Sequence, residues 1–303
     1  MTEFLESVLR GLGTGSVYAL LALGFVIIYK STGVISFAQP ALMLTGATIT
    51  SYVAPAIGIV AFAGFSFFLS MTLAALATAA IALVIERTAI RPMVGRPVFV
   101  VAIITIGIDI AVRVVASGFI GLGARSIPNP WGLERLDVLG LRIQERHLVS
   151  MATLAVIVSV LFWFYQYTRY GLAMRAAAFD QEAALTQGVN VGSVFALSWA
   201  FAGAMAAIAG TLLATSAGVD RQIWIVALIA LPAIILGGLD SLPGAVIGGL
   251  AVGVVESLVG SYQRDVAPWL GDNFALVSAY VLMLLVLLVK PYGLFGTPEV
   301  RRV

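Results

Sequence analysis

The residues best suited to chemistry lie together in one apolar stretch, residues 98–120. Thr105, Asp109 and Arg113 interrupt a hydrophobic run that is long enough to cross a membrane. Charged side chains in such a run are costly and face the interior of a helix bundle or a water-filled cavity. Asp109 and Arg113 are four residues apart, with the acid first, so their side chains meet on one helix face. Two roles are compatible with this pattern: a local ion pair that serves packing, or a pathway wall formed by Asp109 and Thr105.

A second polar group precedes a proline in the apolar block from about 36 to 53. Pro40 predicts either a helix that starts late, with the proline in its first turn, or a helix that is broken within the membrane. Non-helical backbone at that depth persists only where it is buried in protein or lines a wet cavity. The block therefore adds four candidate residues for a solute pathway: Ser36, Phe37, Gln39 and Thr45.

The side chains that most enzymes need are scarce. The 303 residues include one histidine and no cysteine, which excludes disulfides, cysteine redox chemistry and a multi-histidine metal site. Neither of the two lysines, Lys30 and Lys290, follows a glycine, so the sequence has no P-loop motif and we expect no ATP hydrolysis by this chain. No nucleophile and base can be paired. An enzyme is the least favoured class, and we expect the chain itself to bind no metal or cofactor.

A polar, helix-prone segment from Arg169 to Gly192 separates two long apolar blocks. Its apolar residues recur at helical spacing and predict one short amphipathic helix. The apolar face consists of Leu172, Ala176, Phe179 and Ala183, and the remaining surface carries Arg175, Asp180, Gln181 and Glu182. Gly171 and Gly188 punctuate the segment, and Gly188 is well placed to end the helix. Such a helix lies on the membrane surface or docks a partner in the cytoplasm, and the residues alone leave both alternatives open.

These residues are carried by membrane helices. Hydrophobic residues make up 61% of the chain and charged residues 11%, about half the charge of a soluble domain. We predict an all-α, polytopic membrane protein that forms a single transmembrane domain over residues 1–303, with eight to ten helices, some of them broken or re-entrant. The net charge of +2 argues against nucleic acid as a partner. About nine hydrophobic segments are expected, at 7–29, 36–53, 57–86, 98–120, 148–167, 193–216, 223–239, 243–262 and 274–289.

Basic residues assign the two sides of the membrane. Suppose that the 30-residue block 57–86 crosses once. One side of the membrane then carries Lys30, the arginines at 87–96, the segment 169–192 and the C-terminal tail. The positive-inside rule makes that side cytoplasmic, with the N-terminus outside and the C-terminus inside. Because no cationic region precedes the first span, we expect no cleavable signal.

The longest loop, residues 121–147, then lies outside. Apolar and polar residues alternate over 136–138 and 141–144, which predicts a small β-hairpin. Small residues spaced four apart, such as Gly203 and Ala207, predict that the segment 193–216 packs centrally in the bundle.

The remaining class of function is passage of a solute through the helix bundle. A secondary transporter would use intramembrane carboxylates or ion-binding broken helices, and Asp109 and Glu256 give that alternative little support. A transporter that is driven by separate ATPases needs a rigid docking element on its cytoplasmic side. The segment 169–192 meets that need.

Several motifs, taken together and in order, resemble the permease subunits of bacterial branched-chain amino acid ABC importers, specifically the shorter of the two subunits. They are GLGTGSVYALLALG at 11–24, SFA at 36–38, RYGLAMRA at 169–176, FAGAMAAIAG at 201–210, LGGLDSLPGA at 236–245 and KPYGLFG at 290–296. The chain departs from the family pattern at Ser36, Pro40 and Thr48, in the candidate pathway wall.

The resemblance implies an importer in the bacterial inner membrane that moves branched-chain or similar amino acids by alternating access. It implies a heterodimer with a related permease, two cytoplasmic ATPases that bind ATP and Mg, an extracytoplasmic solute-binding protein, and surrounding lipid. The implied ATPase-coupling residues are Arg169, Gly171, Arg175, Asp180, Glu182, Ala183 and Gly188. Relatives that move urea or short-chain amides, and an ion-coupled transporter acting alone, are the alternatives.

Overall fold

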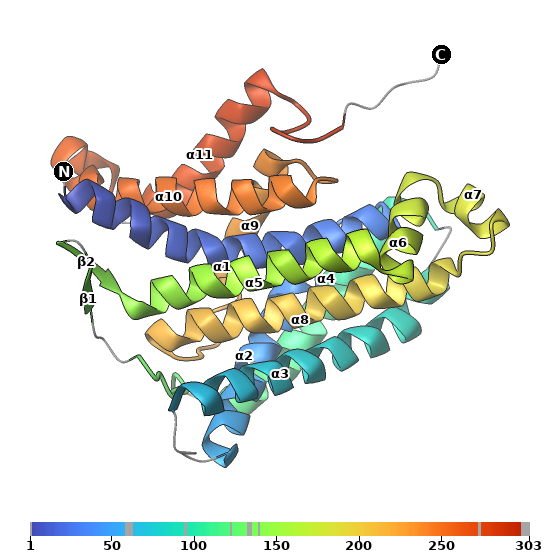
Figure 1. Cartoon of the computed structure of the whole chain (residues 1–303), viewed down its shortest axis with the longest axis horizontal. Coiled ribbons are helices and arrows are strands. Elements are labelled where there is room, and N and C mark those ends of the chain that lie inside the picture. The colour runs from blue at the N-terminus through green and yellow to red at the C-terminus, as the bar shows by residue number, and fades with distance from the viewer. Residues whose placement is uncertain are drawn as a thin grey trace.

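A computed structural model describes residues 2–57, 63–93, 96–121, 123–131, 135–138, 140–271 and 274–297. Within these ranges the chain forms eleven α-helices and one two-stranded sheet (Figure 1). The helices are α1 (Thr2–Thr32), α2 (Gln39–Ile57), α3 (Ala63–Ile85), α4 (Val98–Ile120), α5 (Glu145–Tyr167), α6 (Arg169–Phe179), α7 (Gln181–Thr186), α8 (Val191–Ala217), α9 (Ile225–Gly237), α10 (Leu242–Val266) and α11 (Phe274–Val289). The prediction of an all-α polytopic protein is confirmed.

Seven helices in the described residues are long and apolar enough to cross a membrane, and α9 and α11 are shorter apolar helices. With 13 residues, α9 is about 20 Å long, which is less than the roughly 30 Å of a hydrocarbon core. The helix α9 is therefore too short to cross by itself, whereas α10, with 25 residues, is long enough. The exact number of crossings stays a prediction.

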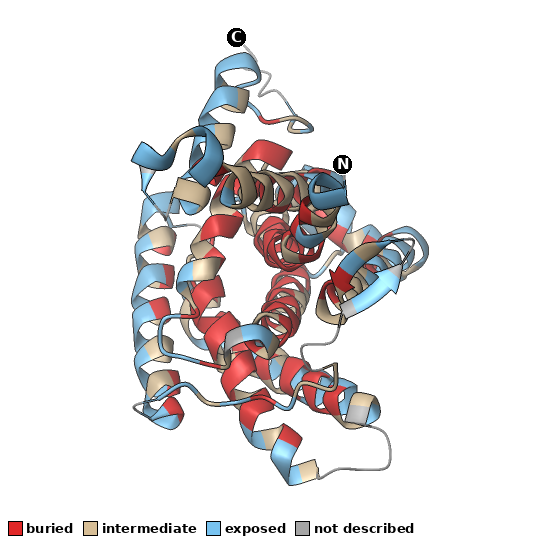
Figure 2. Ribbon diagram, turned by 90° about the vertical axis from the view of Figure 1, so that its left-hand side faces the viewer, coloured by how far each residue is buried: buried red, intermediate tan, exposed pale blue. Residues whose placement is uncertain are grey.

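The helix α1 is the core of the bundle, and α10 packs along it because glycines remove the side chains between them (Figure 2). A Cβ atom at Gly11 would lie 2.6 Å from the Cα of Val254, and one at Gly249 would lie 2.5 Å from the Cα of Ala19. Neither backbone can move aside without separating the two helices. The glycines of both helices are therefore a requirement of packing.

The helix α8 packs against α1, α2 and α3, as its small residues predict. Gly203 faces Thr78 and Ala82 of α3, and Ala207 faces Gly46 of α2. The central position that the sequence analysis gives to this segment is confirmed.

In the block 57–86, Ile57 ends α2, residues 58–62 lie outside the described residues, and residues 63–85 form the single helix α3, which agrees with the single-crossing interpretation. From α3 the chain continues through a π-helical turn, Glu86–Ile90, and a 3-10 turn, Arg91–Met93. The strands β1 (Arg135–Val138) and β2 (Leu141–Gln144) pair antiparallel and form the predicted hairpin.

The basic residues that assign the topology gather at one end of the bundle. In Figure 1 the helices α6 and α7 lie at the right-hand end, opposite the N-terminus and the β-hairpin. Arg91 and Ser31 both form hydrogen bonds with the segment 169–192, which contains α6 and α7. The C-terminal ends of α1 and α3 therefore lie at this end of the bundle too. The predicted tail residues Arg301 and Arg302 lie outside the described residues. Which end faces the cytoplasm stays a prediction.

The C-terminal residues 293–297, here called the C-terminal clasp, close the end of α9. The last carbonyl groups of a helix lack partners within the helix. The carbonyls of Leu236 and Gly237 accept the N–H groups of Leu294 and Phe295 at 2.8 and 3.0 Å. The Asp240 carboxylate accepts both the N–H and the hydroxyl of Thr297. The motifs at 236–245 and 290–296 thus form one structural unit.

Candidate functional site

The start of α2 is held by side chains of α4. After α1 ends at Thr32, the chain is non-helical to residue 38, and Pro40 stands in the first turn of α2. The late-starting helix is therefore the correct alternative. The N–H of Phe37 donates to Thr105 Oγ1 at 3.1 Å, and the N–H of Ala41 donates to Asp109 Oδ1 at 3.0 Å. These donors would otherwise be unpaired, because the first N–H groups of a helix have no partner within it.

Asp109 also forms the ion pair that its spacing predicts. Its Oδ2 lies 2.7 Å from an Nη atom of Arg113, and the Arg113 guanidinium lies 3.8 Å from the centroid of the Trp224 ring. Both carboxylate oxygens of Asp109 are thus engaged. Asp109 connects α4, the start of α2 and, through Arg113, the segment that precedes α9.

Of the residues predicted around Pro40, Ser36 and Gln39 are buried, and they make different contacts. Ser36 Oγ accepts the N–H of Ala38 at 3.4 Å. Gln39 is fully buried, and neither polar atom of its side chain has a hydrogen-bond partner among the described residues. A Cβ atom at Gly24 would lie 2.6 Å from Gln39 Nε2, so this side chain lies against α1 instead of joining Asp109 on α4.

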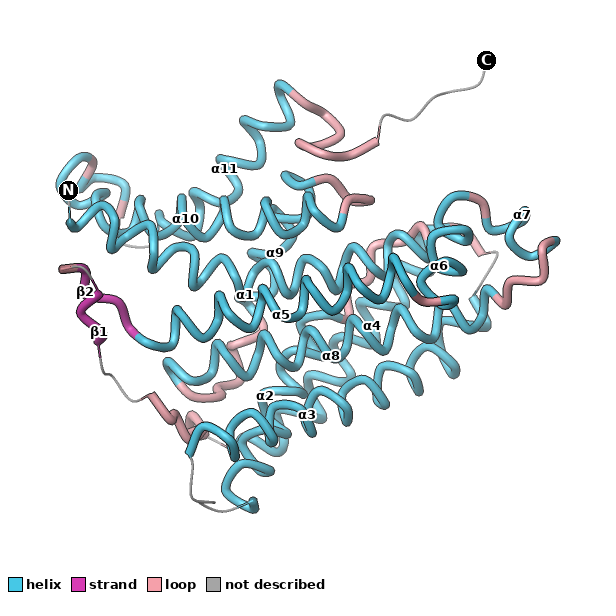
Figure 3. Tube along the Cα trace, viewed as in Figure 1, coloured by secondary structure: helices cyan, strands magenta, loops and turns pink. Residues whose placement is uncertain are grey.

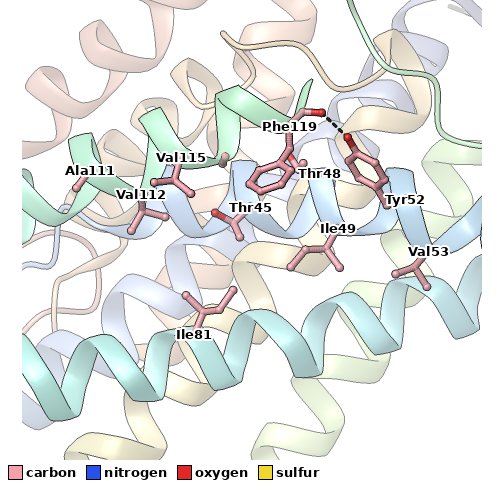
Figure 4. Close-up of a pocket in the computed structure, with 11 residues that line it drawn as sticks. Thr45, Thr48, Ile49, Tyr52, Val53, Ile81, Ala111, Val112, Val115 and Phe119 are labelled. Carbon is pink, nitrogen blue, oxygen red and sulfur yellow. Dashed lines mark hydrogen bonds between the residues drawn. The ribbon is translucent and has the colours of Figure 1, made fainter. Parts of the chain in front are cut away.

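Thr45 lies apart from this group, in an apolar groove of about 640 Å³ between α2, α3 and α4 (Figure 4). Its hydroxyl donates to the carbonyl of Ala41 at 2.7 Å and offers the groove little polarity. The Tyr52 hydroxyl, which lies in the same groove, donates to the carbonyl of Phe119 at 2.7 Å and ties α2 to α4. The structure therefore brings Phe37, Thr105 and Asp109 together and places Thr45 in a separate, apolar environment.

The segment 169–192 contains two helices where the sequence predicts one. The helix α6 ends at Phe179, Asp180 adopts an extended conformation, and α7 begins at Gln181. Asp180 accounts for the break because its carboxylate accepts the N–H of Ala183 at 3.0 Å, which is the N-cap interaction of a new helix. Gly188, with a φ of 81°, ends the second helix as predicted.

Gly171 does not mark a boundary of the segment, contrary to the prediction. It lies inside the first turn of α6 and permits the sharp turn from α5. A Cβ atom there would lie 2.6 Å from the Cα of Tyr165. The N–H of Gly171 donates to Thr168 Oγ1 at 2.9 Å, which makes Thr168 the N-cap of α6. A threonine just before a helix-prone run is a recognisable start signal, although the sequence analysis did not use it.

The predicted apolar face lines a concave groove of about 500 Å³ between α6 and α7. The four apolar residues of that face, Leu172, Ala176, Phe179 and Ala183, all line this groove. Arg175 and Asp180 line it too, whereas Arg169 and Glu182 are exposed outside it. Phe179 is 95% exposed. A surface aromatic beside an apolar groove is typical of a protein interaction site. We call the residues of this groove the docking groove.

Two contacts attach the segment to the transmembrane helices, and the sequence analysis missed both. Arg91 Nη2 donates to the carbonyl of Gly192 at 2.8 Å while the same guanidinium pairs with Glu86. Gln181 Nε2 donates to the carbonyl of Ser31 at the end of α1, at 2.9 Å. The segment 169–192 is thus hydrogen-bonded to the end of α1 and to the turn that follows α3.

Comparisons with known proteins decide the family. A family model described as "Branched-chain amino acid transport system / permease component" matches residues 7–290. The chain belongs to this family. It is 31% identical to the high-affinity branched-chain amino acid transport system permease protein LivH of Escherichia coli K12, over 99% of this chain and 98% of that protein. It is 32% identical, over the same shares, to the corresponding permease protein BraD of Pseudomonas aeruginosa.

A more distant relative agrees with this assignment, and a solved structure shares the fold. The chain is 28% identical to the probable branched-chain amino acid transport permease protein LivH of Methanocaldococcus jannaschii, over 91% of this chain and 88% of that protein. The solved structure of PsaBC from Streptococcus pneumoniae in complex with Fab aligns with a TM-score of 0.51 at 15% identity. The alignment covers 94% of this chain and 92% of that one, which shows a shared fold.

The chain is therefore a multi-pass permease subunit of the bacterial inner membrane, and it is not an ATPase. In this family of transport systems ATP hydrolysis belongs to separate partner subunits. The motifs on which the resemblance rests fall on packing surfaces, on the connector before α2, on the segment 169–192 and on the unit formed by the C-terminal clasp and the end of α9.

Proposed function

We propose that this chain forms part of the solute pathway of an importer for branched-chain or similar amino acids, driven by separate ATPases through alternating access. The family membership over nearly the whole chain, together with the exposed docking groove, carries this proposal. The relatives that are named as branched-chain amino acid permeases match this chain over their full length. The apolar groove beside Thr45 suits an aliphatic side chain better than it suits urea or a short amide.

The partners that this function needs are a second, related permease subunit, two cytoplasmic ATPases and an extracytoplasmic solute-binding protein. The ATPases would bind the ATP and Mg. In this proposal the segment 169–192 docks into one ATPase, with Phe179 inserted into a pocket of that subunit. Closure of the ATPases would then move α1 through the Gln181–Ser31 contact and α3 through the Arg91–Gly192 contact.

The roles of the predicted pathway residues divide in two. Ser36, Phe37, Thr105 and Asp109 would shape the wall at the start of α2, and Gln39 and Thr45 would contribute to the same wall from other faces of that helix. Because both oxygens of Asp109 are engaged, this carboxylate is not free to bind a coupling ion. That observation favours transport driven by ATPases over an ion-coupled transporter acting alone.

The docking assignment is tested with Ala183→Asp, which places an unpaired charge in the docking groove. We expect this variant to lose co-purification with its ATPases. Thr186→Asp is the matched control, because it adds the same charge to α7 at an exposed position that does not line the groove. Normal co-purification and a normal transport rate for Ala183→Asp would show that the docking assignment is wrong.

The energy source and the solute are tested in proteoliposomes. We expect ATP-dependent uptake of leucine only when the permease pair, the ATPases and the binding protein are all present. Uptake driven by an ion gradient in vesicles that contain the permease alone would support the secondary transporter. Uptake of urea or acetamide in preference to leucine by the complete assembly would contradict the proposed solute.

A further inference from the structure

A polar cavity of about 780 Å³ lies beside the docking segment and contains two cationic side chains. Lys30 at the end of α1 and Arg175 on α6 both line it. The turn between α9 and α10 contributes Asp240, and the C-terminal clasp contributes Thr297. The cavity therefore lies where the docking segment meets the ends of the transmembrane helices.

Neither cation has an acidic partner among the described residues. Ion pairs there include Glu86–Arg91, Asp109–Arg113 and Asp137–Arg142. Neither Lys30 nor Arg175 takes part in one, and Arg175 makes only a 3.4 Å hydrogen bond to Gln166 Oε1. The carboxylate of Asp240 is engaged by the N–H and the hydroxyl of Thr297. The described lining of the cavity thus contains two cations and one carboxylate, a net charge of +1, which favours an anion.

A separate, apolar groove of about 330 Å³ lies further along the same helix α1. Its floor is Leu23 of α1, and its walls are Leu161 and neighbouring residues of α5 on one side and Val246 and neighbours of α10 on the other. In Figure 1 the helices α5 and α10 flank α1 in this way, and Figure 3 shows the same three helices as tubes. On α1, Leu23 lies seven residues before Lys30, a rise of about 10 Å.

The polar cavity and the apolar groove thus share one seam along α1. At the start of α10, Leu242 lines the groove, and Asp240, two residues earlier in the preceding turn, lines the cavity. A ligand that fills both has an anionic end at the membrane surface and a hydrocarbon chain that points into the membrane. That is the chemistry of an anionic phospholipid.

We propose that this seam binds one anionic phospholipid, with its phosphate between Lys30 and Arg175 and one acyl chain in the groove between α5 and α10. The bound phosphate would bridge α1 and α6 at the base of the docking segment. The lipid would thereby stiffen the connection through which the docking segment moves the bundle. This site is separate from the solute pathway and does not depend on which solute is carried.

Native mass spectrometry of the purified permease tests the proposal, with phosphatidylglycerol and phosphatidylcholine added in equal amounts. We expect the wild-type chain to retain one phosphatidylglycerol and to exclude phosphatidylcholine. Lys30→Gln should lower that retention by about fivefold, because a basic residue near a lipid surface has an effect of that order. Lys290→Gln is the matched control: Lys290 is an exposed lysine that does not line the cavity, and its substitution should leave retention unchanged.

A second variant separates a lipid from a free anion. Val246→Trp fills the groove and leaves both cations in place, so it should abolish lipid retention, and Leu161→Trp provides the same test from α5. A melting temperature close to that of the wild type shows that the variants are folded. Unchanged retention in both Lys30→Gln and a folded tryptophan variant would overturn the proposal. Retention that survives Val246→Trp and is displaced by inorganic phosphate would identify a free-anion site and would also overturn it.

Discussion

At the scale of single residues, Asp109 connects three elements with one carboxylate. It pairs with Arg113 on its own helix, accepts the N–H of Ala41 at the start of α2, and holds Arg113 over Trp224. The pair with Arg113 is predictable, because spacing along one helix places the two side chains together. The bond to Ala41 joins residues 68 positions apart in the chain and has no signature in the sequence.

We expect Asp109→Ala to destabilise the protein by about 3 kcal/mol, because it leaves the Arg113 charge and the Ala41 N–H without partners in a largely buried site. The melting temperature of the purified chain measures this effect. Asp137→Ala is the control, since Asp137 pairs with Arg142 in an exposed position and its loss should cost less than about 1 kcal/mol. Equal losses for the two variants would contradict the role given to Asp109.

Glycine positions allow a second prediction at this scale. Gly249→Ala should lower the melting temperature markedly, because its Cβ atom would meet the backbone of Ala19 at 2.5 Å. Gly118→Ala, in α4, is the matched control: nothing lies within 4 Å of the added Cβ atom, and alanine favours helix over glycine by about 1 kcal/mol. Equal effects of the two substitutions would contradict the role of Gly249 in the close packing of α1 against α10.

At the scale of elements, the docking segment shows what sequence periodicity can and cannot reveal. The apolar residues Leu172, Ala176, Phe179 and Ala183 do share one surface, as their spacing predicts. They do so across two helices, because Asp180 ends one helix and caps the next. An aspartate is compatible with the exposed face of a helix and with an N-cap, and only the fold decides between the two.

The C-terminal clasp depends on Asp240, which leads to a prediction about mobility. Asp240→Ala should loosen the clasp, because the N–H and hydroxyl of Thr297 lose their acceptor and only the backbone bonds of Leu294 and Phe295 to the end of α9 remain. The chain has no cysteine, so a nitroxide label on Phe295→Cys reports on this segment alone. We expect the label to become more mobile in Asp240→Ala and to stay unchanged in Asp220→Ala, an exposed aspartate outside the clasp. An immobile label in both variants would show that Asp240 does not anchor the clasp.

At the scale of the whole molecule, hydropathy alone predicts most of the architecture. Each of the nine apolar segments contains a helix, since no other structure satisfies the backbone within lipid. Hydropathy does not predict which helices are central. The contrast between α1, which is buried, and α4 and α5, which are mostly exposed, arises from the glycines that let α10 approach α1.

The assigned topology yields a prediction for the complete molecule. The docking groove and the β-hairpin lie at opposite ends of the bundle, so one of them faces the cytoplasm and the other faces outward (Figure 1). The positive-inside rule predicts that the docking end faces the cytoplasm. Single cysteines at Gln187, which lines the docking groove, and at Asp137, in the hairpin, can be introduced into the cysteine-free chain, and both positions are exposed.

In intact spheroplasts that lack the ATPases, a membrane-impermeant maleimide should label Asp137→Cys and leave Gln187→Cys unmodified until the membrane is disrupted. The reverse labelling pattern would show that the molecule has the opposite orientation in the membrane. The docking groove would then lie on the side that has no ATP. Labelling of both positions in intact spheroplasts would contradict the arrangement itself. Only the first result is compatible with a permease that α6 and α7 connect to cytoplasmic ATPases, because the docking groove must lie on the side where ATP is present.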